Sequence, residues 1–128
     1  MLGMLSLLLS VGQAAATPSA VEREIVVIGE RLRTWRARYS VRGSQVRCRT
    51  TRSTGDREID AIGCVAFETC IGRLRARIDE SDRRDLESAA RRSMKAAIER
   101  DLPTCLTERR DELIADLADR RFRARNGE

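Results

Sequence analysis

The sequence predicts an α+β protein, in which a small antiparallel β-hairpin is followed by an antiparallel three-helix bundle and the whole is held by disulfides. Apolar and polar residues alternate from Trp35 to Thr50, which is typical of strands with one buried face. From Asp56 onward, apolar residues recur at three- and four-residue steps, which indicates amphipathic helices. The four cysteines form an even set in a short chain, a pattern that favours disulfide bonds over free thiols.

The first 16 residues have the form of a secretory signal peptide. An apolar run of about ten residues is followed by Ala14 and Ala16, whose small side chains suit signal peptidase and predict cleavage near Ala16. The run is shorter than the roughly 20 apolar residues that cross a bilayer. No basic residue precedes it, which departs from the usual pattern. The alternative for this run is a short buried helix. We therefore expect a periplasmic or secreted product with no transmembrane span.

The mature chain is expected to form one domain over residues 25–123. Residues 17–24 show no apolar period and predict a flexible N-terminus, whereas the polar residues 124–128 predict a frayed C-terminus. The β-branched run Ile25–Ile28, which ends at Gly29, predicts a short strand.

A β-hairpin is expected between Trp35 and Thr50, with a turn at Gly43, the residue type that tolerates positive φ. Its apolar face would carry Trp35, Tyr39, Val46 and Cys48. The opposite face would carry five arginines: Arg36, Arg38, Arg42, Arg47 and Arg49.

Three helices are expected after the hairpin. Asp56 suits the N-cap of the first helix, and either Ser81 or Asp82 suits the N-cap of the second. Pro103 should end the second helix and occupy the first turn of a third. The connections between them are short, so neighbouring helices should run antiparallel.

The cysteines are Cys48, Cys64, Cys70 and Cys105. Four cysteines allow three pairings, and we favour Cys48–Cys64 with Cys70–Cys105 because Cys48 ends the hairpin near the first helix and Cys70 faces the bundle interior. The competing arrangement is Cys48–Cys70 with Cys64–Cys105. Their spacing lacks the close pairs of a zinc site, so no metal is expected.

Catalytic chemistry has little support in the sequence. Without histidine, neither a Ser-His nor a Cys-His relay can be built, and the glycines are too scattered to cradle a phosphate. Most acidic residues flank arginines in the pattern of solvated helix faces. We therefore predict neither an enzyme nor a cofactor.

The positive charge is concentrated in the N-terminal third of the mature chain. Residues 21–55 hold nine arginines and three glutamates, whereas residues 56–128 are close to neutral. The arginine face of the hairpin could meet lipid headgroups, lipopolysaccharide phosphates or an acidic envelope protein, and the alternative is that it is only a solvated strand face. Nucleic acid is not favoured, because stacking aromatic residues are missing from that face.

These observations predict a small exported protein without catalytic activity that binds another envelope component. The alternative function is inhibition of an extracellular or periplasmic enzyme. Inhibitors of that kind present an exposed loop, and Arg42-Gly43-Ser44 is the candidate segment.

Overall fold

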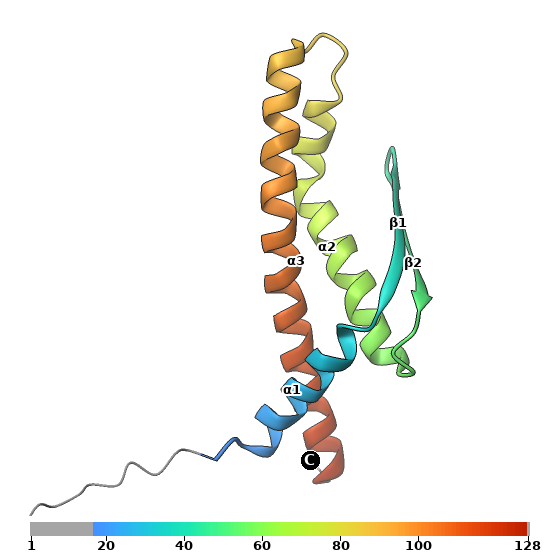
Figure 1. Ribbon diagram of the computed structural model, residues 1–128, viewed down its shortest axis with the longest axis vertical. Helices are drawn as coiled ribbons and strands as arrows, with labels where there is room; N and C mark the ends of the chain where they lie inside the picture. Colours follow the sequence, from blue (N-terminus) through green and yellow to red (C-terminus); the bar gives the residue numbers. More distant parts are fainter. Residues whose placement is uncertain (1–16, 128) are drawn as a thin grey trace, which may run out of the picture.

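The computed structural model describes residues 17–127, and the predicted signal peptide lies outside them. Three helices and one β-hairpin make up this part of the chain (Figure 1). In chain order the elements are α1 (Ala20–Leu32), β1 (Arg36–Arg42), β2 (Gln45–Arg52), α2 (Arg57–Ser81) and α3 (Ser88–Arg125). The predicted α+β class, with a two-stranded antiparallel sheet and three helices, is confirmed.

The helices α2 and α3 form a long antiparallel pair that sets the length of the molecule (Figure 1). The shorter α1 crosses the C-terminal part of α3, and the hairpin runs alongside α2 (Figure 1). One helix thus precedes the hairpin and two follow it, which differs from the predicted order of elements.

The prediction of a strand at Ile25–Ile28 is wrong, because these residues lie within α1. A capping box starts the helix: the Ser19 side chain accepts the N–H of Glu22, and the Glu22 side chain accepts the N–H of Ser19. Ile28 and Leu32, one helical turn apart, are then buried together. Burial of this stripe outweighs the β-propensity of the run. Residues 20–24, expected to be irregular, are helical as well.

The prediction that Pro103 separates two helices is also wrong, since α3 continues through it. The Pro103 side chain is exposed, so its ring displaces no neighbouring helix. The Cys70–Cys105 disulfide anchors α3 to α2 beside the proline. Tertiary packing therefore maintains a helix that proline alone would interrupt. The helix α3 begins at Ser88, so neither Ser81 nor Asp82 is its N-cap as predicted. It extends to Arg125, into the C-terminal segment that was expected to fray.

The hydrophobic core lies where α1, α2 and α3 meet beneath the start of the hairpin. Its buried members come from all three helices and from the segment before β1: Ile28, Leu32, Trp35, Ile59, Ile62, Ile114, Leu117 and Ala118. Further along α2, Phe67, Cys70 and Leu74 are also buried. The segment that leads into the hairpin is thus anchored in the hydrophobic core through Trp35.

Two disulfides link the elements, and both follow the favoured pairing. Cys48–Cys64 joins β2 to α2 with a Cα–Cα distance of 5.4 Å, and Cys70–Cys105 joins α2 to α3 with one of 5.9 Å. Over residues 17–127, none of the helices combines the length and the apolar character needed to cross a bilayer.

Candidate anion-binding face of the hairpin

The two strands pair so that polar side chains share the face directed away from α2. The residues that are directly opposite one another on this face are Arg38 with Arg49, Ser40 with Arg47, and Arg42 with Gln45. The alternate positions, Tyr39 with Cys48 and Val41 with Val46, point to the other face. The alternation predicted from the sequence is therefore present, and it gathers four arginines.

A two-residue turn, Gly43-Ser44, joins the strands. Gly43 has φ +56°, whereas Ser44 does not have a positive φ. This combination matches a type II′ turn, which places glycine first and fits the twist of a hairpin. Arg42 is consequently held in strand pairing with Gln45 instead of lying on an extended loop.

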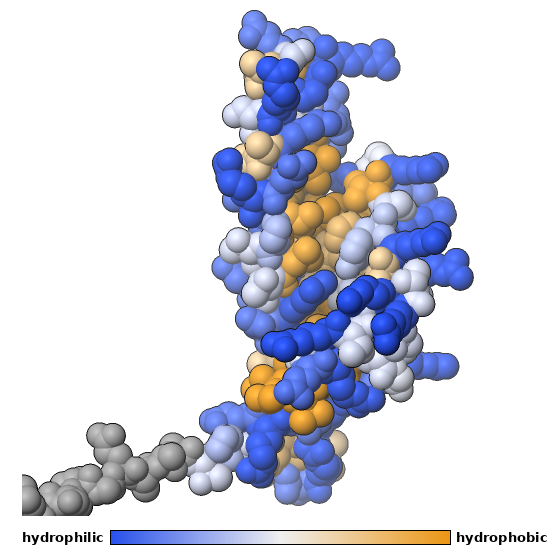
Figure 2. Space-filling model, in the orientation of Figure 1, coloured by the Kyte–Doolittle hydropathy of each residue, from blue (hydrophilic) through white to orange (hydrophobic). Residues whose placement is uncertain are grey.

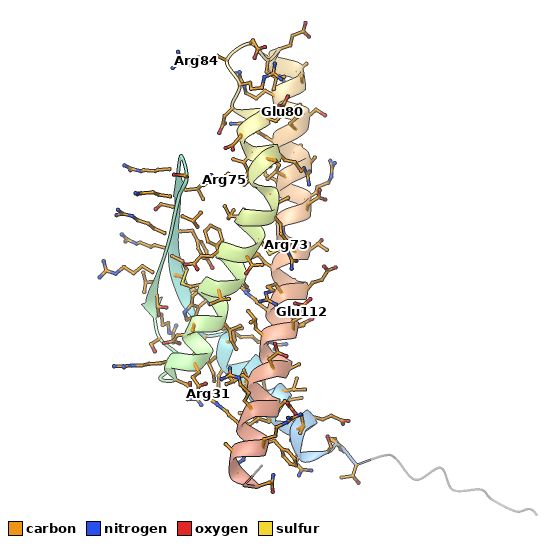
Figure 3. All side chains as sticks on the ribbon, turned by 180° about the vertical axis from the view of Figure 1, so that it is seen from behind. Arg31, Arg73, Arg75, Glu80, Arg84 and Glu112 are labelled. Atoms are coloured by element: carbon orange, nitrogen blue, oxygen red, sulfur yellow. A yellow bond between two sulfur atoms is a disulfide. The ribbon has the colours of Figure 1, made fainter. Side chains whose placement is uncertain are left out.

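Contacts on the inner face fix the orientation of the hairpin on α2. The Cys48–Cys64 disulfide is one of them, and the ring centroids of Tyr39 and Phe67 lie 4.1 Å apart. At the base, Trp35 Nε1 donates to Thr50 Oγ1 at 2.9 Å. Long nitrogen-tipped side chains therefore extend from the hairpin away from α2 (Figure 3).

All five predicted arginines are exposed, but they are not equivalent. Arg38, Arg42, Arg47 and Arg49 have no ion-pair partner within residues 17–127. Arg36 lies beyond a register shift between Arg36 and Ala37, and its Nη1 donates to the carbonyls of Arg33 and Trp35. We define the basic face as Arg38, Ser40, Arg42, Gln45, Arg47 and Arg49.

The charge on this face has no internal counter-ion, unlike the charge of several arginines elsewhere in the molecule. Arg83, Arg109 and Arg121, for example, each pair with a carboxylate. Between residues 36 and 52 the sequence contains no acidic residue. Arg38 and Arg49 are directly opposite each other, a like-charge pair that destabilises a hairpin. An external anion that lies across the face would relieve this repulsion.

A depression of about 340 Å³ lies on the basic face near its tip, lined by Ser40, Arg42, Gln45 and Arg47. Each of these side chains can donate hydrogen bonds, and two are guanidinium groups that match the geometry of phosphate oxygens. Ser40 and Gln45 were not among the site residues predicted from the sequence. The strand register, which places them opposite Arg47 and Arg42, is the signal that could have identified them.

Asp56 and Asp60, two carboxylates whose pKa values are lowered, stabilise the start of α2 and the loop before it. Burial raises the pKa of Asp60, but hydrogen bonds from Ser53 and Thr54 outweigh this effect, and the pKa is lowered. Asp56 caps α2 and pairs with Arg121. Within the described part of the chain, no three His, Cys, Asp or Glu residues are grouped closely enough to hold a metal ion.

Comparison with known proteins gives no match to a family model, to a curated protein or to a solved structure. Function is therefore inferred from the residues and their geometry.

Proposed function

We propose that this protein is an exported, non-catalytic module that binds a phosphate-bearing surface of the cell envelope through its basic face. The observation that carries the proposal is the set of four exposed arginines on one face of a hairpin that contains no acidic residue. Within residues 17–127 they lack internal counter-ions, so their charge is available to a partner.

Export is supported by the covalent structure. The four cysteines form two disulfides, a state that persists in oxidising compartments and is rare in the cytosol. The apolar N-terminal run and the alanines at positions 14 and 16 agree with a cleaved signal peptide. We place the mature protein in the periplasm or outside the cell.

The shape of the basic face favours a surface of lipid headgroups over a folded protein partner. Binding sites for proteins depend on buried aromatic anchors, and the aromatic Tyr39 of the hairpin contacts Phe67 on the opposite side. The face instead presents exposed guanidinium groups from both strands, which suits a surface that carries many phosphates. In the space-filling view, strongly hydrophilic side chains project outward from the hairpin on the side away from the helices (Figure 2).

Enzyme inhibition, the alternative function, has less support from the geometry. An inhibitory loop must enter a cleft in extended form, whereas Arg42-Gly43-Ser44 belongs to a tight two-residue turn. The basic face, and not the turn at Gly43-Ser44, is therefore the surface expected to bind the partner.

Vesicle co-sedimentation tests the proposal with the mature protein. We expect binding to phosphatidylglycerol vesicles, weaker binding as salt rises, and little binding to phosphatidylcholine vesicles. The combined variant Arg38→Ser, Arg47→Ser and Arg49→Ser should lose at least about tenfold in affinity. The combined variant Arg73→Ser, Arg84→Ser and Arg92→Ser is the matched control.

The control variant removes the same charge from positions in α2, in α3 and in the loop between them that carry no ion pair in the described chain. It should retain affinity within about threefold, because a general loss of charge weakens binding only modestly. Equal losses in the two variants would refute a specific role for the basic face. If the protein bound polyglutamate and did not bind vesicles, its partner would be an acidic polypeptide and not a lipid surface.

A further inference from the structure

A second cationic site lies in a depression of about 290 Å³ between the start of β1 and α3. Its apolar lining comes from the end of α1, from the segment before β1 and from β1 itself: Leu32, Trp35, Ala37 and Tyr39. Three arginines border it: Arg33 after α1, Arg36 at the start of β1, and Arg110 in α3. Three arginines, one of them far from the others in the sequence, thus line one depression together with two aromatic residues.

None of these three arginines pairs with a carboxylate within residues 17–127. Arg110 lies over the Trp35 ring, with its Cζ 5.8 Å from the ring centroid. Its Nε is buried and has no hydrogen-bond partner. Three like charges around one depression without a counter-ion repel one another. An anion in the depression would compensate the charge of these arginines.

We propose that this depression binds a small amphipathic anion: a phosphate ester that carries a short apolar group. Arg33, Arg36 and Arg110 would hold the phosphate, since guanidinium groups form paired hydrogen bonds with its oxygens. Trp35 and Tyr39 would contact the apolar group. The volume is near the lower end of ligand sites, roughly 300–1,000 Å³, and fits a headgroup or a small ester.

The proposed site is separate from the basic face, with which it shares no residue. The depression on the basic face is lined by polar residues alone, whereas this depression is lined by two aromatic residues as well as by arginines. Its ligand could be a membrane phospholipid or a free phosphate ester. Both sources share the chemistry that the depression recognises, and the choice of probes distinguishes them.

Trp35 is the only tryptophan of the chain, so tryptophan fluorescence reports directly on this depression. The mature, oxidised protein is titrated with dihexanoylphosphatidylglycerol below its micellar concentration, with phenyl phosphate and with inorganic phosphate. We expect a saturable change with at least one of the two esters, at a concentration at least about tenfold lower than inorganic phosphate requires. Tighter binding of the lipid identifies a membrane source, and tighter binding of phenyl phosphate identifies a free ester.

Two adjacent arginines on α3 supply a matched pair of variants. Arg110→Gln should weaken ester binding at least about tenfold. Arg109→Gln should change it less than about twofold, because Arg109 pairs with Glu112 and does not line the depression. If Arg110→Gln unfolds, Arg33→Gln, at an exposed position, takes its place.

The triple arginine variant of the basic face should retain ester binding, so that the failure of one proposal is distinguishable from the failure of the other. No saturable signal with either ester would overturn the proposed site. Inorganic phosphate that binds as tightly as the esters would overturn its amphipathic character. Equal losses of ester affinity in Arg109→Gln and Arg110→Gln would show that only the net charge of the protein matters, and would overturn the role of Arg110.

Discussion

The indole ring of Trp35 lies directly on the backbone of α2 at Gly63. A Cβ atom placed at Gly63 would overlap the ring, so only glycine allows this close approach. The same indole donates a hydrogen bond to Thr50 of β2 and lies beneath Arg110 of α3. One side chain therefore connects the base of the hairpin to both long helices, and it also lines the proposed phosphate-ester site.

Gly63→Ala should destabilise the protein, although alanine favours a helix over glycine by about 1 kcal/mol. The rigid, buried ring has little room to move, and overpacking typically costs about 1–3 kcal/mol. Gly72→Ala, in the same helix, is the control because its new Cβ would meet no atom within 4 Å. Urea unfolding measures both variants. Equal stability of the two would contradict the close contact with Trp35.

Removing the two disulfides should have different consequences. Cys70–Cys105 closes a separation of 35 residues between the long helices, and its loss should cost about 4 kcal/mol; Cys48–Cys64 closes 16 residues, and its loss should cost about 3 kcal/mol. The paired Cys→Ala variants are compared by urea unfolding and hydrogen exchange. Loss of Cys48–Cys64 should expose mainly the amides of β1 and β2 to exchange. Uniform exchange across the chain would contradict a hairpin held locally by this bond.

The parts of the fold that depend on local patterns could be predicted from the sequence. The hairpin and its basic face follow from the alternation around Gly43, and burial of Cys70 indicated its partner Cys105. The helical state of Ile28 could not be predicted, because it depends on burial against α3 that no local preference reveals. The same reason explains why the proposed phosphate-ester site was missed: only the packing of α3 brings Arg110 to Arg33.

Asp56 should make stability sensitive to acid. Its carboxylate accepts the N–H groups of Glu58 and Ile59 and a hydrogen bond from Arg121 at 2.7 Å. Burial raises the pKa of Asp56, but the Arg121 and backbone hydrogen bonds outweigh this effect, and the pKa is lowered. The folded state then keeps the carboxylate ionised where the unfolded chain binds a proton. The stabilisation is therefore present above about pH 4 and is lost as the pH falls through the lowered folded pKa.

Asp56→Asn should lower the free energy of unfolding at pH 7 by about 1–2 kcal/mol, through loss of the negative charge at the N-terminus of α2 and of the Arg121 pair. It should also flatten the decline in stability below about pH 4. Urea unfolding between pH 2 and pH 7 measures both effects. Asp111→Asn, at an exposed position outside this network, serves as the control. An unchanged pH profile in Asp56→Asn would exclude Asp56 as a source of acid sensitivity.

Pro103→Ala should stabilise the protein. Pro103 lies inside α3 and has no N–H to donate, so the carbonyl of Glu99 lacks its helical partner there. Because Pro103 is exposed, alanine removes no core packing and restores the hydrogen bond. The gain should be about 1–3 kcal/mol, seen as a rise of several degrees in Tm.

Thr104→Ala separates this effect from helix propensity alone. Thr104 is the exposed neighbour of Pro103, and its replacement should gain at most about 0.7 kcal/mol. Thermal unfolding of both variants is followed by circular dichroism with the disulfides intact. If Pro103→Ala raises the Tm no more than Thr104→Ala does, the prediction is wrong and the proline does not weaken α3. The Cys70–Cys105 bond and the contacts with α2 would then compensate fully for the missing hydrogen bond, and reduction of that bond should restore the difference between the two variants.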